Sequence, residues 1–342
     1  MAKIDTVIII LTPFHKKVIF HLFPDAFANE NTLILYRSII NVDEYKCHKQ
    51  KLTDFNFSRK KIFKSPMQYL RPFRKKVMTI KEEIKVLEGN YDFSKQLKLY
   101  FCSDKDVFSQ ILLQKLNFSH IVAIDEGLGF YVRLSLKDHV IAFLYRILTP
   151  VLFSQRIYYI KRMGTLSQID LVYLRKIDLL PRLKKGINYK EFHIKSAQKK
   201  RVIKPGEVLF FSFPEQDFLF DPEEKLRLQK NIADYLKKHN KKLVIKPHPR
   251  ENVSFLRNGL ADNENVVVLE GNLLGEELDY FKYEFIINIF SSIILDIIDS
   301  LYPKERLITL GFPKLPPMKF DGSLKYIHIH EFKIEEHIEF ET

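Results

Sequence analysis

Short apolar segments alternate along this chain with segments of helical periodicity, and this alternation limits the fold more than any other feature. Helical patterns fill many gaps, notably residues 104–116 and 222–238, where Asp104 and Asp221 are candidate N-caps. Strand–helix alternation is typical of parallel sheets covered on both faces, so we predict the α/β class. The predicted strands are Val7–Leu11, Thr32–Tyr36, Lys98–Cys102, His120–Ile124, Gln155–Ile160, Asp170–Tyr173, Val208–Phe211, Lys242–Ile245, Asn265–Leu269, Phe285–Ile289 and Arg306–Leu310.

Two basic stretches interrupt the alternation. Residues 46–81 hold 12 Lys and Arg against the single acid Asp54, and residues 182–204 hold 9 against the single acid Glu191. The first stretch also carries aromatic side chains among its cations. It fits an anionic membrane surface, a negatively charged glycan acceptor or a plain solvated helical face, and the sequence leaves all three open.

The second basic stretch lies mid-chain, just before a predicted strand begins at Glu207. We interpret residues 186–205 as a basic linker between two α/β domains, residues 1–185 and residues 206–342. Open α/β sheets bind ligands at the carboxyl ends of their strands. Two such domains in tandem therefore predict a cleft between those ends.

The composition excludes several classes of protein. With 46% hydrophobic and 28% charged residues, the chain is neither disordered nor collagen-like. Its only cysteines, Cys47 and Cys102, rule out a disulfide framework and a cysteine-based zinc site, and they fit a reducing compartment. The sequence lacks the G-x-G-x-x-G and P-loop motifs, which argues against a dinucleotide enzyme or a P-loop ATPase.

The net charge of +13 favours an anionic partner, such as nucleic acid, acidic lipid headgroups or a charged substrate. The basic stretches match no helix-turn-helix, RNA-recognition or KH signature, so we expect no nucleic-acid partner. The apolar run at residues 7–11 is too short for a signal peptide. Residues 140–153 fall short of the ~20 residues of a spanning helix, so we predict a core helix there rather than an interfacial membrane segment. We therefore expect a cytoplasmic protein, soluble or peripheral at the inner face of the cytoplasmic membrane.

Three polar motifs follow predicted strands, and the first is Asp125-Glu126-Gly127. Two adjacent carboxylates at the end of a sheet repel each other and lose solvation, which raises the pKa of at least one of them. Such a group suits a general base toward a hydroxyl, and the glycine allows a tight turn beside a ligand. The alternative is an ordinary acidic turn.

The second motif places His248 between Pro247 and Pro249 at the end of another predicted strand. Each proline locks its own φ, so the imidazole has little backbone freedom. With Lys246 and Arg250 on either side, this loop suits an anionic leaving group such as phosphate. The alternative is a rigid loop without a chemical role.

The third motif is Ser291-Ser292, between a predicted strand and an apolar helical pattern that begins at Ile293. The N-terminus of a helix offers free N–H groups and a favourable dipole, and serine adds a small hydroxyl donor, so phosphate is a fitting ligand. A plain serine N-cap is the alternative, and the two interpretations are compatible.

The order of these motifs resembles that of the bacterial sialyltransferases, which carry a D/E-D/E-G motif, a His-Pro motif and a paired Ser/Thr motif. The resemblance extends over roughly residues 5–310. Leu11-Thr-Pro-Phe-His15 is similar to the opening of glycosyltransferase family 52. Lys246-Pro-His-Pro-Arg250 is similar to the bacterial polysialyltransferases of family 38.

The resemblance implies a GT-B fold, with two Rossmann-like α/β/α domains and an interdomain cleft. It also implies an inverting transfer of sialic acid from CMP-sialic acid to a glycan hydroxyl, with neither metal nor cofactor. The acceptor would be a bacterial surface glycan, of capsule or lipooligosaccharide type, and lipid-linked if it is made at the inner membrane. The N-terminal domain would hold the acceptor and the base, and the C-terminal domain would bind the nucleotide sugar.

The resemblance also implies roles for individual residues. Asp125 or Glu126 is the base, with Glu126 favoured for its longer arm, and His248 protonates or hydrogen-bonds the departing phosphate. Ser291 and Ser292 hold that phosphate. Further candidates lie on the donor side, at Lys246, Pro249 and Ser212, and near the acceptor, at Gly127, Thr12 and His15.

Two other functions compete with this one. Another activated donor, CMP-Kdo or CDP-glycerol, is compatible with the His-Pro and Ser-Ser sites, although the acidic motif favours the sialyltransferase. A noncatalytic basic module that binds an anionic polymer or a membrane would explain the charge. It would not explain three polar motifs at strand ends.

Overall fold

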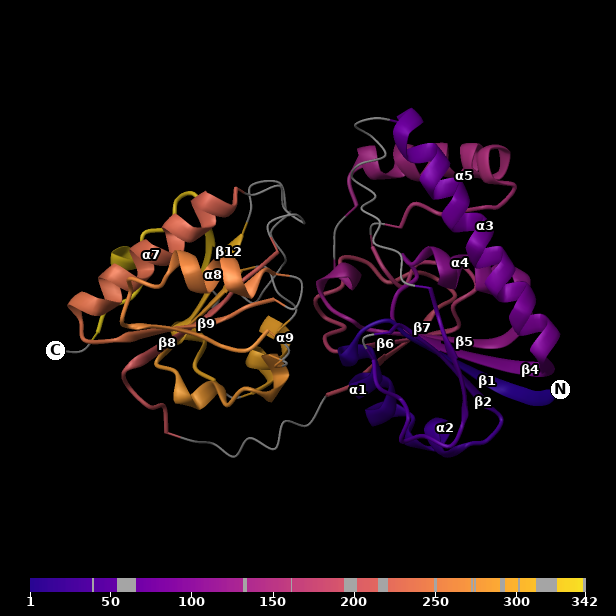
Figure 1. The fold of residues 1–342 in the computed structure, drawn as a ribbon, viewed down its shortest axis with the longest axis horizontal. Coiled ribbons are helices and arrows are strands. Elements are labelled where there is room, and N and C mark those ends of the chain that lie inside the picture. Colours follow the sequence, from indigo (N-terminus) through magenta and orange to yellow (C-terminus); the bar gives the residue numbers. More distant parts are fainter. Residues whose placement is uncertain are drawn as a thin grey trace. The chain divides into compact units, whose positions relative to one another are not determined.

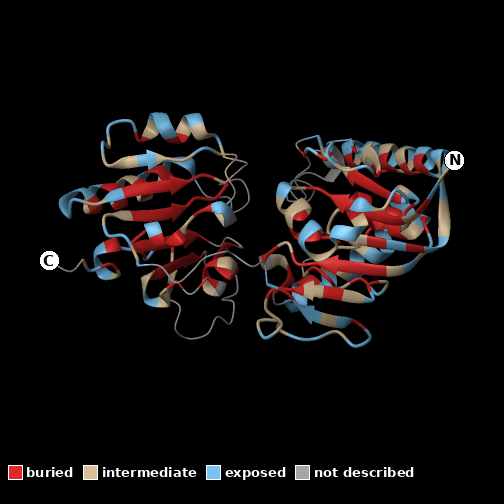
Figure 2. Ribbon diagram, turned by 90° about the horizontal axis from the view of Figure 1, so that it is seen from below, coloured by how far each residue is buried: buried red, intermediate tan, exposed pale blue. Residues whose placement is uncertain are grey.

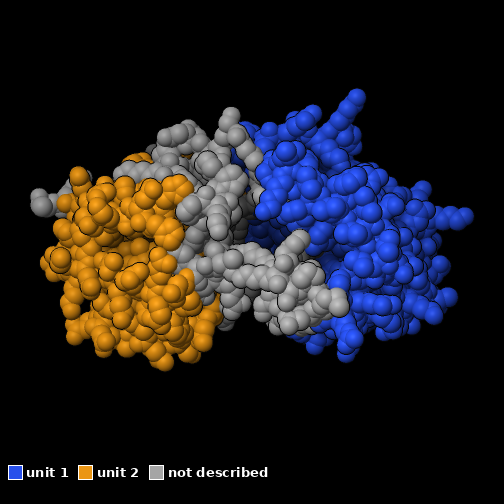
Figure 3. Space-filling model, turned by 90° about the horizontal axis from the view of Figure 1, so that it is seen from above, with its two compact units in different colours: residues 1–194 blue, residues 195–342 orange. Residues whose placement is uncertain are grey.

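The computed structural model divides the chain into two compact units, residues 1–194 and residues 195–342 (Figures 1 and 3). Each unit contains its own sheet, and every paired strand in both sheets is parallel. The structure describes residues 1–38, 40–53, 66–131, 134–160, 162–193, 202–214, 221–248, 251–271, 273, 275–289, 293–300, 302–311 and 325–340.

Unit 1 has a seven-stranded sheet in the order β3-β2-β1-β4-β5-β6-β7. Its strands are β1 (Ala2–Ile10), β2 (Thr32–Tyr36), β3 (His48–Lys51), β4 (Tyr91–Phe101), β5 (Phe118–Ile124), β6 (Leu171–Leu174) and β7 (Asn188–Glu191). Helices cover both faces of this sheet (Figure 1). They are α1 (Pro13–Leu22) and α2 (Pro24–Ala28) on one face, and α3 (Pro66–Asn90), α4 (Val107–Lys115) and α5 (Leu136–Phe153) on the other.

The middle of this sheet is the core of unit 1 (Figure 2). Val7, Ile8, Ile9 and Ile10 are at most 1% exposed, because helices pack on both faces of β1. The chain runs from β1 outward to β3 and then returns to β4 on the other side of β1. The strand order thus reverses between β1 and β4, and such a switch point opens a crevice at the carboxyl ends of the strands.

Unit 2 has a six-stranded sheet in the order β10-β9-β8-β11-β12-β13. Its order reverses in the same way, here between β8 and β11. The strands are β8 (Glu207–Phe211), β9 (Lys242–Lys246), β10 (Val266–Val268), β11 (Phe285–Ile289), β12 (Leu307–Gly311) and β13 (Lys325–His328). The helices are α7 (Pro222–Lys238), α8 (Val253–Gly259) and α9 (Ile293–Asp299).

The predicted start of α7 is confirmed, because Asp221 accepts a hydrogen bond from the backbone N–H of Glu223 at 3.0 Å. The predicted N-cap of α4 is wrong. Asp106, rather than Asp104, caps this helix by accepting from the backbone N–H of Ser109 at 3.0 Å. Asp104 is buried instead.

The strand predictions differ from the structure in two ways: one predicted strand is absent, and β3, β7 and β13 were not predicted. Residues 155–160 form no strand; the backbone N–H of Ile157 donates to the hydroxyl of Thr149 at 2.9 Å rather than to a neighbouring strand. Conversely, Asn188–Glu191 lies inside the predicted linker, residues 186–205, yet it forms β7 and pairs with β6. This segment is polar and mostly exposed, so its sequence carries no apolar strand pattern.

The prediction of a core helix at residues 140–153 is also wrong. These residues belong to α5, and much of its apolar surface faces solvent. In the described part of the chain, no helix is both long enough and apolar enough to cross a membrane.

Candidate active site

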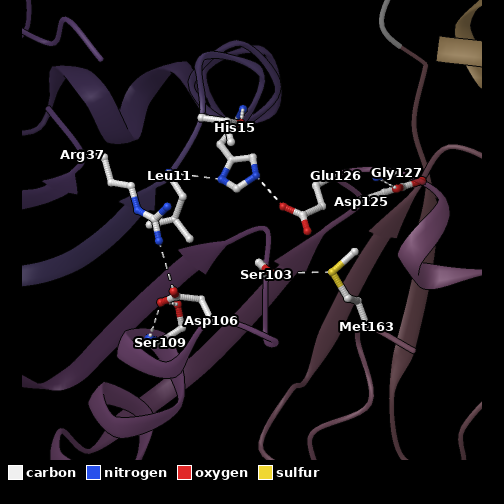
Figure 4. Close-up of polar contacts among 11 residues, drawn as sticks. Leu11, His15, Arg37, Ser103, Asp106, Ser109, Asp125, Glu126, Gly127 and Met163 are labelled. Carbon is white, nitrogen blue, oxygen red and sulfur yellow. Dashed lines mark hydrogen bonds and ion pairs between the residues drawn. The ribbon is translucent and has the colours of Figure 1, made fainter. Parts of the chain in front are cut away.

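In unit 1, the side chains of His15 and Glu126 meet at the carboxyl edge of the sheet (Figure 4). His15 Nε2 lies 2.5 Å from Glu126 Oε2. The other ring nitrogen, Nδ1, accepts a hydrogen bond from the backbone N–H of Leu11 at 3.2 Å. Because a backbone N–H can only donate, Nδ1 carries no proton. The proton therefore sits on Nε2, and a neutral imidazole donates to the Glu126 carboxylate.

The start of α1 fixes the position of His15. Thr12 is the N-cap of this helix, and its hydroxyl accepts from the backbone N–H of His15 at 3.2 Å. His15 thus lies in the first turn of α1, just after β1, and its side chain is only 2% exposed. The two predicted acceptor-side residues therefore act together in the structure: Thr12 caps the helix, and His15 reaches Glu126.

Asp125 has very different surroundings from its neighbour. Its side chain is fully buried and accepts from the backbone N–H of Gly127 at 2.6 Å, the backbone N–H of Arg175 at 3.1 Å and the hydroxyl of Tyr131. The Arg175 guanidinium Nε lies 3.6 Å from Asp125 Oδ2 and forms a buried ion pair. Burial, and then the charge of Asp125, raise the pKa of Tyr131, which keeps its phenol a donor.

Gly127 turns the chain between these two environments. Its φ of 142° is rarely accessible to residues with a side chain, so the glycine predicted for a tight turn is required by the backbone. The turn leaves the side chain of Asp125 buried and that of Glu126 at the carboxyl edge of the sheet, where it is 23% exposed. Among the described residues, no hydrogen bond reaches Glu126 Oε1, so one carboxylate oxygen is held and the other is available.

A third carboxylate, Asp104, lies buried just after β4. Its Oδ2 accepts from the backbone N–H of Thr165 at 3.0 Å. Burial raises the pKa of Asp104 to about 6, even though backbone N–H groups and Lys105 favour the charged form. Nearby, the Ser103 hydroxyl contacts Met163 Sδ at 3.6 Å beneath the His15–Glu126 pair (Figure 4).

In unit 2, a buried carboxylate that the sequence analysis missed organises the strand ends. Glu251 accepts from the backbone N–H of His248 at 2.5 Å and from the hydroxyl of Ser212 at 2.7 Å. It also pairs with Lys225 at 2.5 Å, and both of these side chains are 0% exposed. Burial raises the pKa of Glu251, while Lys225 favours its charged form. The network joins the ends of β8 and β9 to α7.

The sequence did contain a signal for this network. Lys225 and Gln229 occupy the same helical stripe as Ile232, Ala233 and Leu236, all of which are buried. Two polar residues one turn apart on a buried stripe need polar partners, because buried polar groups are almost always hydrogen-bonded. Gln229 donates to Ser212 Oγ at 3.3 Å, and the Lys225 ammonium donates to the Glu251 carboxylate and to the carbonyl of Phe213.

The donor-side candidates fall into two groups. Lys246 is buried and donates to the carbonyl of Pro247, and Ser212 donates to Glu251, so both side chains make internal contacts. Pro249, Ser291 and Ser292 lie outside the described residues. The strands that lead into all these loops are neighbours, since β8 lies between β9 and β11. The described ranges contain no group of three or more His, Cys, Asp and Glu side chains placed to hold a metal ion.

Comparison with known proteins gives this arrangement a context. A family profile described as "Alpha-2,8-polysialyltransferase (POLYST)" matches residues 2–297. An uncharacterized protein of Haemophilus influenzae is 27% identical over 197 residues, which cover 51% of this chain and 60% of that protein.

Two solved structures were among those similar to the chain. The glycotransferase of kitacinnamycin has a TM-score of 0.52 at 10% identity, covering 97% of this chain and 88% of that one. The GT-B domain of a sialyltransferase from Photobacterium damselae has a TM-score of 0.45 at 12% identity, covering 89% and 90%. The chain therefore shares the α/β fold of a known glycosyltransferase structure, and it belongs to the alpha-2,8-polysialyltransferase family.

Proposed function

We propose that this protein transfers sialic acid, with inversion, from CMP-sialic acid to a hydroxyl of a bacterial surface glycan. The observation that carries the proposal is the partly exposed Glu126 carboxylate, which has one oxygen hydrogen-bonded to a neutral His15 and the other available at the carboxyl edge of the sheet. Family membership supports sialic acid as the transferred sugar.

The proposed reaction is a single displacement at the anomeric carbon. Glu126 Oε1 accepts the proton of the acceptor hydroxyl while the hydroxyl oxygen forms the new glycosidic bond. The bond between the anomeric carbon and the CMP phosphate breaks, and its electron pair leaves on the phosphate oxygen. His248 donates a hydrogen bond or a proton to that oxygen. One displacement of this kind inverts the anomeric centre.

The surroundings of the two acids favour Glu126 over Asp125 as the base. Asp125 is fully buried and accepts three hydrogen bonds, so it has no access to an acceptor hydroxyl. Its proposed role is to anchor the turn. A base must lie within hydrogen-bond reach of the proton that it abstracts, and the partly exposed Glu126 meets this condition.

His15 is proposed to orient the base rather than to accept a proton. Protonation of Nδ1 would break the hydrogen bond from the Leu11 backbone N–H, which favours the neutral ring. A neutral Nε2–H donor holds one oxygen of Glu126 and directs the other toward the crevice. Such pre-orientation reduces the reorganisation needed at the moment of reaction.

The proposed roles of the residues that bind the donor rest on the family resemblance and on the hydrogen-bond network around Glu251. Ser291 and Ser292 would hold the phosphate, and Glu251 would fix the backbone of the His248 loop. Hydroxyl and imidazole donors are sufficient partners for a monophosphate, so we propose that no metal ion or cofactor is needed. The acceptor is proposed to be a glycan of capsule or lipooligosaccharide type, lipid-linked at the inner face of the cytoplasmic membrane.

A donor screen tests the proposal. The purified protein is incubated with CMP-sialic acid, CMP-Kdo, CDP-glycerol or a UDP-sugar, each with and without an oligosialic acid acceptor and EDTA, and nucleotide release and product mass are measured. We expect release from CMP-sialic acid, stimulated by acceptor and unaffected by EDTA. Release from CMP-Kdo or CDP-glycerol alone would identify a different donor. Loss of activity in EDTA would overturn the metal-independent mechanism.

A further inference from the structure

The outward side of α5 carries an apolar surface that none of the described residues of unit 1 covers. Eight large hydrophobic side chains of this helix are exposed, among them Leu136 at 82%, Phe143 at 63% and Val151 at 79%. The full set is Leu136, Val140, Phe143, Leu144, Ile147, Leu148, Val151 and Leu152. Contiguous exposed apolar patches on soluble domains mark surfaces that bind something.

The spacing of these residues places them on one face. They follow one another at intervals of three, four and one along the helix, which is the pattern of a single helical stripe. The opposite side is anchored to unit 1, where Thr149 is buried and Phe153 packs against Phe73 with ring centroids 4.9 Å apart. The stripe thus faces outward because the other side of the helix is packed.

The fold also fixes both ends of α5. Ser135 and Asp138 form a reciprocal capping box at the start of the helix. At the other end, Lys81 of α3 donates to the carbonyls of Phe153 and Ser154 at 3.3 and 2.9 Å. The apolar stripe is therefore presented on an ordered helix beside α3 (Figure 1).

The surroundings of the stripe are basic. Lys137 and Arg146 are exposed on α5 itself, and Arg71, Arg74 and Lys75 are exposed on the half of α3 that contains Phe73. The only acid of α5, Asp138, is buried in the capping box, and residues 66–81 contain no acid. Cations border the apolar stripe, and no acid of α5 or of residues 66–81 is exposed to offset them.

An open pocket adds to this arrangement. It has a volume of about 400 Å³, lies at the C-terminal end of α5, and is lined by Pro150, Ser154, Arg156 and three glutamines among others. An apolar stripe with a basic border and an adjoining polar pocket has the chemistry of a surface that rests on acyl chains and contacts anionic headgroups.

Charge argues against a second copy of the chain as the occupant. A two-fold interface centred on α5 would bring Arg146 and its basic neighbours against their own copies, since such an interface pairs the same patch from each subunit. Juxtaposed like charges oppose association. An anionic lipid surface has no such conflict, because both its acyl chains and its headgroups complement the patch.

We propose that α5, with the first half of α3, docks unit 1 on the surface of an anionic lipid bilayer, with α5 lying in the interface and its apolar stripe inserted among the acyl chains. This surface serves the proposed function, because a lipid-linked acceptor lies at the same bilayer. The docking itself requires neither donor nor acceptor, so it can be tested without any assumption about the reaction.

Vesicle sedimentation of the full chain tests the proposal. The wild type is mixed with vesicles of phosphatidylcholine and the anionic lipid phosphatidylglycerol, or with vesicles of phosphatidylcholine alone. We expect binding to the anionic vesicles that is at least tenfold tighter. The variant F143S/I147S should lose at least tenfold of this affinity, whereas V86S/V267S, which removes two exposed apolar residues elsewhere, should bind like the wild type.

Three further readouts decide the outcome. Thermal melting should be unchanged in F143S/I147S, because both residues are exposed. R71S/R74S/K75S should weaken binding mainly at low salt, because exposed charges are screened at higher ionic strength. Equal vesicle affinity of the wild type and F143S/I147S would overturn the proposal. So would a wild-type dimer that F143S/I147S dissociates while vesicle binding is absent, since a second copy would then cover the stripe.

Discussion

In unit 1 the side chain of His15 hydrogen-bonds the candidate base, Glu126. In unit 2 the side chain of Glu251 instead hydrogen-bonds the backbone of the candidate acid, His248. His15 donates directly to the carboxylate of Glu126 and leaves the other oxygen available. Glu251 accepts from the backbone N–H of His248, and a fully buried ion pair with Lys225 fixes Glu251 in turn. Both groups lie at the carboxyl ends of strands, and in each sheet one of those strands (β1 or β8) borders the point where the strand order reverses.

The difference separates chemistry from stability. Removing His15 changes the orientation of a partly exposed carboxylate, so its effect should fall on the reaction. Removing Glu251 leaves the charge of Lys225 buried without its partner, so its effect should fall first on the folding of unit 2. Asp125 belongs with Glu251 in this respect, although it lies next to Glu126 in the sequence.

The largest effect should come from the adjacent acids of unit 1. We expect Glu126→Gln to lower kcat by about 10²–10⁴, the usual contribution of a positioned general base, with donor binding and melting temperature preserved. Asp125→Asn should instead lower the melting temperature, because it disturbs a buried ion pair and its hydrogen bonds. Steady-state kinetics and thermal melting of both variants make the comparison. A stable Glu126→Gln enzyme with normal kcat would move the base elsewhere.

The next largest effect should be structural and confined to unit 2. Glu251→Gln should destabilise the unit by about 3–5 kcal/mol, because it leaves the charge of Lys225 buried without a partner of opposite charge. The double variant Lys225→Met/Glu251→Gln should recover much of this loss, since it removes both charges. Urea unfolding of the three proteins measures the effect. If the double variant were less stable than Glu251→Gln, the ion pair would not be the source of the loss.

A smaller effect is expected at His15, and it should depend on the replacement. His15→Leu removes the Nε2–H donor and should lower kcat by up to about 10²-fold, the scale of a misplaced catalytic group. His15→Gln can present an amide N–H in place of Nε2–H and should retain more of the activity. KM should change less than kcat in both. Equal losses in the two variants would point to packing rather than to the hydrogen bond.

The smallest effect concerns pH and the buried Asp104. Its pKa in the folded protein is about 6, above the ordinary value of about 4, so the folded state binds this proton more tightly. Stability contributed by this group is therefore lost as the pH rises from about 4 through 6. Asp104→Asn should remove this dependence and melt a few degrees above the wild type at pH 7 but not at pH 4. Asp106→Asn, which keeps a capping acceptor, is the control. If the melting temperature of Asp104→Asn differed from that of the wild type by the same amount at pH 4 and pH 7, the assignment to Asp104 would be contradicted.

The alternation of strands and helices was sufficient to predict two α/β domains, because apolar periodicity is set within each element by its burial. The prediction was wrong where that link is weak. β7 is polar because it is a short edge strand, and residues 157–160 are apolar or aromatic without pairing in the sheet. In α5 the predicted helix is present, but its apolar stripe faces solvent, because periodicity alone does not determine which side of a helix is covered.

For the site, the sequence by itself determined the order of the motifs, the acids at 125 and 126, and the glycine that turns the chain after them. It left open which acid is the base. Only the tertiary structure separated Asp125 from Glu126, and only it joined Glu126 to His15 across 111 residues of sequence, and Lys225 to Glu251. The physical reason is that each motif consists of a few consecutive residues at the end of one strand. Burial and side-chain pairing depend instead on which strands lie next to one another in the sheet.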